Sequence, residues 1–213
     1  MRKIQKFESN LSHDQIFTSK ANVLEFLQNR VKKSKIEKLL YFTISDWKSN
    51  SRKILSDTAE YFHDSKYVII RSSAIGEDSV ESSYAGAYES ILNTNPRSHS
   101  SLKKTIHLVI LSYKKKNNVN SNNQILIQNQ TLNIITSGVI FTRTPDIGAP
   151  YYVINYEEGG STTKTTHGLS NSMIKIFRNT ELAKLEKKWR LLLSSVKELE
   201  SISPINWQLA VEK

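Results

Sequence analysis

Residues 67–95, YVIIRSSAIGEDSVESSYAGAYESILNTN, determine how the rest of the chain is interpreted. Residues 67–70 are aromatic and β-branched, a composition that favours a buried strand. Arg71 follows directly, and a guanidinium at the end of a buried strand can offer its planar set of N–H donors to a phosphate. The serines and glycines behind it allow backbone N–H groups to approach a polyphosphate closely. An ordinary surface turn that carries a surface arginine explains the same composition equally well.

The composition is that of a soluble globular protein with enough residues to bury a sizeable core. The chain has 213 residues, of which 38% are hydrophobic and 23% are charged. No apolar run approaches the roughly 20 residues that cross a bilayer, and the basic N-terminus lacks the apolar segment of a secretory signal. There is no cysteine, which excludes disulfides and thiolate chemistry. These features predict a cytoplasmic protein with no membrane partner.

The formal net charge of +10 could attract nucleic acid, anionic lipid or a polyanionic nucleotide. The basic residues are scattered, with small groups at 32–35, 114–116 and 187–190, and solvated helix faces explain most of them. The sequence has neither zinc-finger spacing nor a platform of interleaved aromatic and basic residues. It therefore argues against a nucleic-acid partner.

Hydrophobic periodicity predicts helices and strands that alternate along the chain. Helices are expected at 21–31, 54–62, 98–113 and 180–199, the last with Thr180 as its N-cap. Strands are expected at 39–42, 67–70, 84–93, 125–127, 138–142, 151–156 and 206–211. The polar stretch at 114–123 has no periodicity and is the expected loop between two lobes. The fold class predicted from this pattern is α+β.

The order of motifs resembles the ATP-binding region of the pyruvate phosphate dikinase and phosphoenolpyruvate synthase family. Arg-Ser-Ser-Ala at 71–74 is followed by Glu-Asp, then by Ser-Tyr-Ala-Gly and Glu-Ser-Ile-Leu. Three further segments recur in the family's order: QILIQNQ at 124–130, SGVIFTRTP at 137–145 and NWQLAVE at 206–212. The resemblance covers nearly the whole chain. It implies that residues 1–213 form one ATP-grasp-type, PEP/pyruvate-binding domain, with two lobes of mixed or antiparallel sheets and flanking helices.

The resemblance implies two catalytic cations, Arg71 and Lys20, that neutralise the phosphates of ATP bound between the lobes. The family carries its lysine just ahead of the first helix in a Gly-Gly-Lys-like context, and here Thr18 and Ser19 replace the glycines. A cation beside the N–H donors of a helix start is a sound anion site. A solvated surface lysine is the alternative interpretation of Lys20.

The resemblance also implies a set of nucleotide-binding residues. Ser83 and Gly86 would belong to the loop that covers the phosphates, and Gln128 and Gln130 would lie at the adenine hinge. Arg143 would add positive charge near the phosphates. An edge-strand glutamine and a loop arginine are the alternative interpretations of Gln128 and Arg143.

The last motif departs from the family at the positions that hold magnesium. The family places two carboxylates there, separated by one residue so that both point to one side of the strand. This sequence has Asn206 and Gln208 at those positions. Amide oxygens can coordinate a hard cation, but the loss of two negative charges weakens the attraction. The expected cofactors are therefore ATP and a magnesium ion that is weakly bound or lost.

Family proteins continue into a swivelling domain with a phosphorylated histidine and into an acceptor domain, which this sequence lacks. The resemblance implies the ATP-binding domain of a dikinase-like phosphotransferase, truncated or degenerate, with weak autonomous activity. The alternative is a non-catalytic partner or scaffold subunit for a separately encoded phosphohistidine chain. Residues 149–168, APYYVINYEEGGSTTKTTHG, further resemble a subgroup found with surface-polysaccharide biosynthesis, which includes an ATP-dependent L-glutamine kinase.

Overall fold

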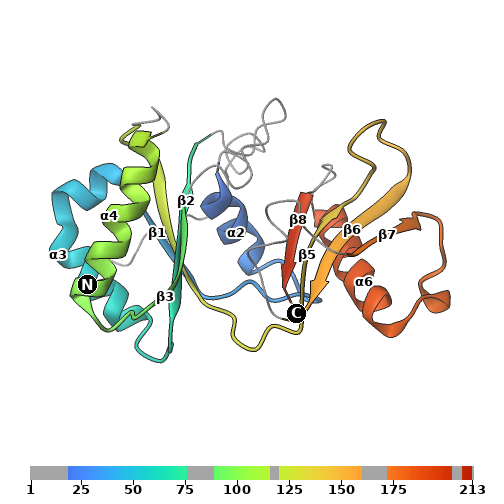
Figure 1. Cartoon of the computed structure of the whole chain (residues 1–213), viewed down its shortest axis with the longest axis horizontal. Coiled ribbons are helices and arrows are strands. Elements are labelled where there is room, and N and C mark those ends of the chain that lie inside the picture. The colour runs from blue at the N-terminus through green and yellow to red at the C-terminus, as the bar shows by residue number, and fades with distance from the viewer. Residues whose placement is uncertain (1–18, 76–88, 116–119, 160–171, 203–207, 213) are drawn as a thin grey trace. The chain divides into compact units, whose positions relative to one another are not determined.

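The chain divides into two compact units, shown in the computed structural model of Figure 1. The structure describes residues 19–75, 89–115, 120–159, 172–202 and 208–212, the last range by its backbone alone. Unit 1 contains Met1–Leu27 and Lys38–Gln128, and unit 2 contains Gln28–Glu37 and Asn129–Lys213. The division therefore falls after the polar stretch at 114–123. Among the described residues, no helix has the length and apolar character needed to cross a membrane.

Unit 1 is built on a four-stranded sheet in the order β1-β4-β2-β3. Its strands are β1 (Leu39–Thr43), β2 (Val68–Ser73), β3 (Ser90–Thr94) and β4 (Gln124–Asn129). β1 pairs antiparallel with β4, and β2 pairs antiparallel with β3 after an irregularity between Val68 and Ile70. The strands predicted at 39–42, 67–70 and 125–127 are confirmed.

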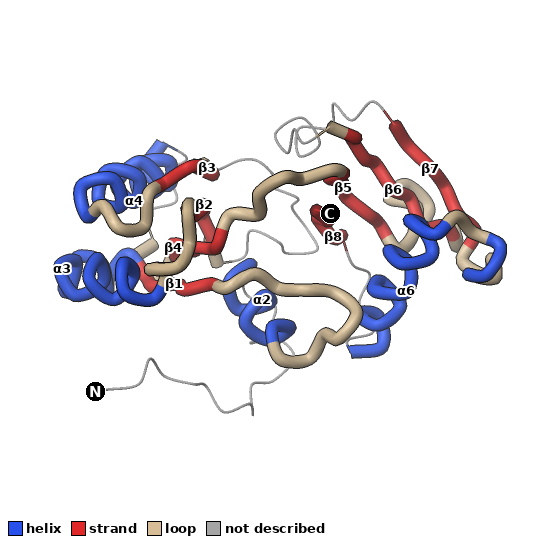
Figure 2. Tube along the Cα trace, turned by 90° about the horizontal axis from the view of Figure 1, so that it is seen from below, coloured by secondary structure: helices blue, strands red, loops and turns tan. Residues whose placement is uncertain are grey.

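Helices cover both faces of this sheet. α3 (Ile44–Tyr61) and α4 (His99–Lys115) lie on one face and α2 (Lys20–Gln28) on the other, as Figures 1 and 2 both show. The core on the α3 and α4 face contains Trp47, Leu55, Phe62, Val68, Ile70, Leu102, Ile106, Val109, Ile125 and Ile127. The alternate strand residues, including Ile69, Arg71 and Ser73, belong to the α2 face because successive side chains of a strand point to opposite sides.

α3 begins ten residues earlier than the expected helix at 54–62. Thr43 and Asp46 form a capping box, in which Thr43 Oγ1 accepts the N–H of Asp46 and the Asp46 carboxylate accepts the N–H of Thr43. Such a box satisfies two N–H groups that would otherwise lack partners at the helix start. The helix is interrupted at Asn50, whose φ of −137° is not helical. The apolar repeat is clear only after that break, at the residues where the sequence predicts the amphipathic helix.

Unit 2 is built on an antiparallel sheet in the order β7-β6-β5-β8, covered on one face by α6 (Lys187–Ile202). Its strands are β5 (Thr136–Phe141), β6 (Tyr151–Glu158), β7 (Ser172–Phe177) and β8 (Gln208–Glu212). The core against α6 contains Ile140, Tyr152, Ile154, Ile176, Trp189, Leu193 and Val196. Together the two units confirm the predicted α+β class, with antiparallel sheets and flanking helices.

The helix predicted at 180–199 begins later than expected, and Thr180 is not its N-cap. A short 3-10 helix, η1 (Leu182–Lys184), comes first, and Leu185 is then extended with ψ of 151°. The N–H of Thr180 instead donates to the Phe177 carbonyl in a turn. Leu182 and Leu185 still pack on the unit 2 core, so the apolar repeat continues across a backbone that is not one helix.

The early segment at 28–37 is held to α6 within unit 2. The carboxylate of Glu198 accepts the backbone N–H groups of Lys32 and Lys33, at 3.0 and 2.9 Å. Ser195 Oγ donates to the carbonyl of Lys33 at 2.8 Å. Three hydrogen bonds to backbone atoms thus fix a segment that is far from α6 in sequence.

A polar anchor joins β6, α6 and the end of β7. Arg178 Nη1 donates to Glu200 Oε1 at 2.6 Å and to the Thr142 carbonyl at 2.8 Å. Tyr152 Oη donates to Glu200 Oε2 at 3.0 Å, and the Arg178 guanidinium lies 4.7 Å from the Tyr152 ring centre. Burial, followed by the hydrogen bond to Glu200, raises the pKa of Tyr152 to about 12.

We expect Tyr152→Phe to lower the free energy of unfolding by about 1 kcal/mol at pH 7, since it removes one hydrogen bond to a charged acceptor. The folded-state pKa of Tyr152 lies above the unfolded value, so its contribution is complete below about pH 10 and is lost as the pH rises toward 12. Urea unfolding at several pH values would show the difference between the two proteins shrinking over that interval. A difference that stays constant across pH would contradict this assignment.

Candidate functional site

Three of the residues predicted from the sequence lie on one face of the unit 1 sheet. Ser73 of β2 and Gln124 of β4 both contact the first turn of α2, which places their side chains on the α2 face. Arg71 is two residues from Ser73, and Gln128 is four residues from Gln124, so alternation places both on the same face. Lys20 is the first residue of α2. The structure therefore assigns Lys20, Arg71 and Gln128 to one face.

The two cations of this face come from α2 and β2, which the hydrogen bond between Ala21 and Ser73 joins. Arg71 is half-buried and lies about 7 Å along β2 from Ser73, given the rise of a strand per residue. Ser73 Oγ accepts the N–H of Ala21, the neighbour of Lys20, at 3.0 Å. A half-buried guanidinium and an ammonium at a helix start are two donors suited to a polyphosphate.

The start of α2 does not offer its N–H groups in the way that the sequence suggested. The N–H of Ala21 donates to Ser73 Oγ, that of Asn22 to Ser19 Oγ at 3.3 Å, and that of Val23 to the Ser19 carbonyl at 3.1 Å. Protein acceptors thus occupy three of the N–H groups of the first turn. An anion at this end would interact with the positive charge of Lys20 and with the helix dipole rather than with those groups.

The predicted residues of unit 2 have different surroundings. Gln130 follows β4 and is half-buried, and Gln208 is the first residue of β8, opposite Phe141 of β5. Arg143 is exposed, and its Nη1 donates to the Gly148 carbonyl at 3.1 Å within its own loop. The described contact of Arg143 is thus the one expected of an ordinary loop arginine.

Ser83, Gly86 and Asn206 lie outside the described residues, as does the first half of the predicted strand at 84–93, whose second half is largely β3. The described part of the chain contains no group of three His, Cys, Asp or Glu side chains that could hold a metal ion. Two neutral amides do not supply the charge that a magnesium ion between phosphates needs.

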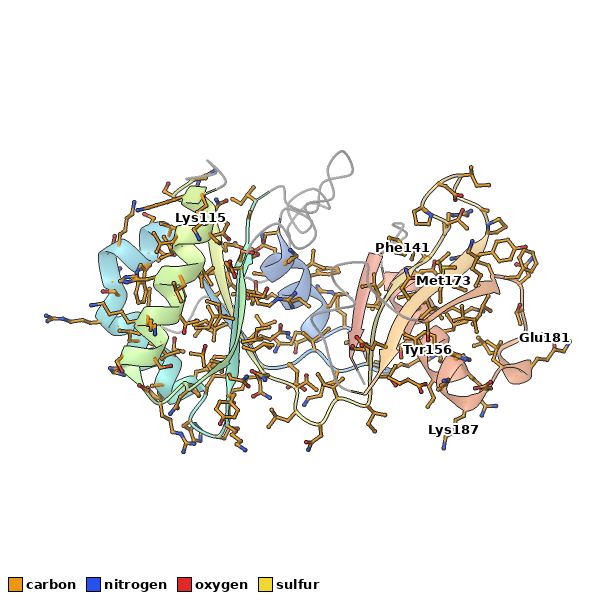
Figure 3. All side chains as sticks on the ribbon, viewed as in Figure 1. Lys115, Phe141, Tyr156, Met173, Glu181 and Lys187 are labelled. Carbon is orange, nitrogen blue, oxygen red and sulfur yellow. The ribbon has the colours of Figure 1, made fainter. Side chains whose placement is uncertain are left out.

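Unit 2 has an open hollow of about 310 Å³ on the sheet face that α6 does not cover. Its apolar wall contains Phe141, Val153 and Met173, and its polar wall contains Asp146, Asn155 and Lys175. Phe141 and Met173 are labelled in Figure 3.

Sequence reasoning missed the residues that hold the Lys20 and Arg71 elements together. Gln124, Ser19 and Tyr113 are buried and hydrogen-bonded beneath the start of α2. Gln124 lies 105 positions from Ser19 and 51 from Ser73, so no local pattern connects them. The one signal in the sequence was Ser73, a small polar residue that follows the apolar strand residues 67–70.

The chain matches the family model described as the pyruvate phosphate dikinase AMP/ATP-binding domain, over residues 14–160. The match covers more than half of the chain, including every described strand of unit 1. A comparison with curated proteins finds no match.

Two solved structures illustrate the distant structural likeness. One is the dinucleotide-forming acetyl-coenzyme A synthetase 1 of Ca. Korarchaeum cryptofilum, in complex with coenzyme A, Ca-AMPCP and HgCl+. It is 13% identical, with 74% of this chain and 62% of that chain covered and a TM-score of 0.38. The other is D-alanyl-alanine synthetase A of Vibrio cholerae O1 biovar eltor, 9% identical, with 83% and 45% covered and a TM-score of 0.39. The chain spans less than two thirds of either structure.

Proposed function

Because the chain belongs to the pyruvate phosphate dikinase AMP/ATP-binding domain family, we propose that it binds ATP through the α2 face of unit 1. Arg71 and Lys20 would contact the polyphosphate, and Gln128 would lie nearer the base. The observation that carries this proposal is the placement of Arg71, Gln128 and the Lys20 helix on one face, from elements far apart in sequence.

The chemistry of these residues fits a nucleotide polyphosphate. A guanidinium presents paired N–H donors in the geometry of two phosphate oxygens, and a lysine ammonium acts as a mobile point charge. Gln128 lies about 13 Å along β4 from Gln124, which contacts the first turn of α2, so Gln128 is well separated from the start of that helix. ATP supplies a transferable phosphoryl group when bound, and these residues would bind and orient it.

The residues at the two magnesium positions of the last strand are poor ligands for that ion. Asn206 and Gln208 carry no negative charge, so we propose that ATP binding depends little on magnesium. Phosphoryl transfer rests mainly on positioning and on stabilising charge, which makes the missing carboxylates a direct reason for weak autonomous activity.

Calorimetric titration of ATP into the full chain, with and without magnesium, tests this function. We expect saturable binding whose dissociation constant changes less than about threefold when magnesium is added, a difference below about 0.7 kcal/mol. The double variant Asn206→Asp with Gln208→Glu should make binding clearly magnesium-dependent. Absence of ATP binding would refute the function, and strong magnesium dependence in the original chain would refute the interpretation of the last strand.

The finer parts of the proposal rest on resemblance. Residues 149–168 support membership of the surface-polysaccharide subgroup, with phosphorylation of a small amide as its reaction class. The family resemblance supports a phosphohistidine partner protein, with the scaffold role as the alternative. A chain without cysteine supports a cytoplasmic location. A pull-down with and without ATP would separate a partner module from an autonomous enzyme.

A further inference from the structure

We propose that Gln124 is a positioning residue for the nucleotide phosphates, because it fixes the first turn of α2, and with it Lys20, to the ends of β2 and β4. The inference rests on the proposed function, since Lys20 must contact the phosphates for its position to matter. Gln124 itself touches no part of the proposed ligand. It acts through the residues on either side of Lys20.

All the polar groups of the Gln124 side chain point at α2 or at the end of β2. Its Oε1 accepts the hydroxyl of Ser19 at 2.6 Å and the hydroxyl of Ser73 at 3.3 Å. Its Nε2 donates to Asn22 Oδ1 at 3.1 Å. One side chain therefore holds the residue before Lys20 and the residue two places after it.

Ser73 of β2 and Tyr113 of α4 complete the hydrogen-bond network around Gln124. Ser73 Oγ accepts the N–H of Ala21, and the N–H of Ser73 donates to Tyr113 Oη at 2.8 Å. Tyr113 Oη in turn donates to the main-chain carbonyl of Gln124 at 2.7 Å. Residues 19, 21 and 22 are thus each hydrogen-bonded to the sheet. These contacts lie on both sides of Lys20 in the sequence.

The burial of this network makes its geometry specific. Ser19 and Ser73 are at most 1% exposed, and Gln124 is 8% exposed. Buried polar groups are costly unless they are hydrogen-bonded, so rotating or sliding α2 would break several bonds at once. Apolar packing alone would hold the helix against the sheet but would tolerate such a shift. The network therefore defines where the Lys20 backbone lies relative to Arg71.

A second contact holds α2 farther along its length. Tyr41 Oη of β1 donates to Glu25 Oε2 at 2.6 Å. Burial, together with that hydrogen bond, raises the pKa of Tyr41 above its ordinary value, so the hydroxyl stays a donor around neutral pH. α2 would consequently remain docked when Gln124 is replaced, and only its first turn would be released.

The test compares Gln124→Met in two backgrounds, the original chain and Lys20→Met, by calorimetric titration with ATP. If Gln124 acts through Lys20, the replacement weakens binding about tenfold in the original chain and less than about twofold in the Lys20→Met background. Thr105→Val is the matched control, because it removes the buried Thr94–Thr105 hydrogen bond of 3.3 Å between β3 and α4. This control should leave the affinity unchanged although it also removes a buried hydrogen bond of unit 1.

Amide hydrogen exchange of the same proteins measures the positioning without nucleotide. The N–H groups of Ala21 and Asn22 should exchange faster in Gln124→Met, while those of β1 and β4 keep their protection. Ser73→Ala, which removes the acceptor of the Ala21 N–H, should reproduce the effect if Gln124→Met fails to fold.

Equal weakening in both backgrounds would overturn the inference, as would unchanged affinity in a folded Gln124 variant. An original chain that does not bind ATP would refute the proposed function. Exchange at Ala21 and Asn22 would then still decide whether Gln124 fixes the helix start. Failure of the inference and failure of the function thus give different results.

Discussion

Replacing Arg71 with alanine should weaken ATP binding by about 100-fold, equivalent to about 2.7 kcal/mol. Arg71 is half-buried on the α2 face, where water screens a charge less than at an open surface. A guanidinium that makes two charge-assisted hydrogen bonds to a phosphate contributes free energy of this order. Calorimetric titration of ATP into the folded variant is the measurement.

Two comparisons make the Arg71 result specific. Arg52→Ala removes the same charge from an exposed position of α3, on the opposite face of the sheet, and should leave the affinity within about twofold. Arg71→Lys keeps the charge but loses the planar pair of donors, so it should fall between the two. Equal effects from the two alanine variants would mean that ATP responds only to overall positive charge.

Gly138→Ala should destabilise unit 2 by about 3 kcal/mol, the cost of forcing a methyl group into a closed space. A Cβ at Gly138 would lie 2.6 Å from the carbonyl oxygen of Asn155 and 3.1 Å from Cβ of Tyr156, both on the neighbouring strand β6. β5 is also paired with β8 on its other side, so it cannot simply move away. Urea unfolding with amide exchange of β5 and β6 would measure the loss.

Gly148→Ala provides the contrast. Gly148 has a φ of +66°, but nothing lies within 4 Å of an added Cβ. Only backbone strain opposes this change, at a cost of about 1 kcal/mol. If the two alanine variants lost equal stability, close approach of the strands would not be the reason for Gly138. The exchange of β1 and β4 in unit 1 should be unaffected by either change.

The sequence predicted secondary structure best where apolar residues recur with a regular period. The strands at 39–42 and 125–127 and the helix at 98–113 were predicted because one face of each is continuously apolar. β7 was missed, although Ile174 and Ile176 alternate with exposed Met173 and Lys175 in the way that a half-buried strand requires. The late start of α6 could not be predicted, since Leu185 continues the apolar repeat in an extended conformation.

For the candidate site too, the sequence indicated some residues and could not indicate the contacts that join them. Lys20 and Arg71 could be proposed from motif order, but their common face follows only from contacts made by Ser73 and Gln124. Those contacts join residues far apart in the chain, where periodicity carries no information. Of the occupied N–H groups at the start of α2, that of Ala21 likewise depends on Ser73, a partner from another element, whereas those of Asn22 and Val23 donate to the nearby Ser19.

The hydrogen bonds from Lys32 and Lys33 to Glu198 join an early segment to a late one, so they can form only late in synthesis. The sheet of unit 1 has all its strands once Asn129 has been made. The segment at 28–37 has been made by then, but its acceptor comes among the last residues of α6. That segment is joined at both ends to unit 1 and therefore cannot form these hydrogen bonds until α6 has been made. A fragment starting at Asn129 would lack it entirely, so unit 2 cannot be obtained intact by a single cut.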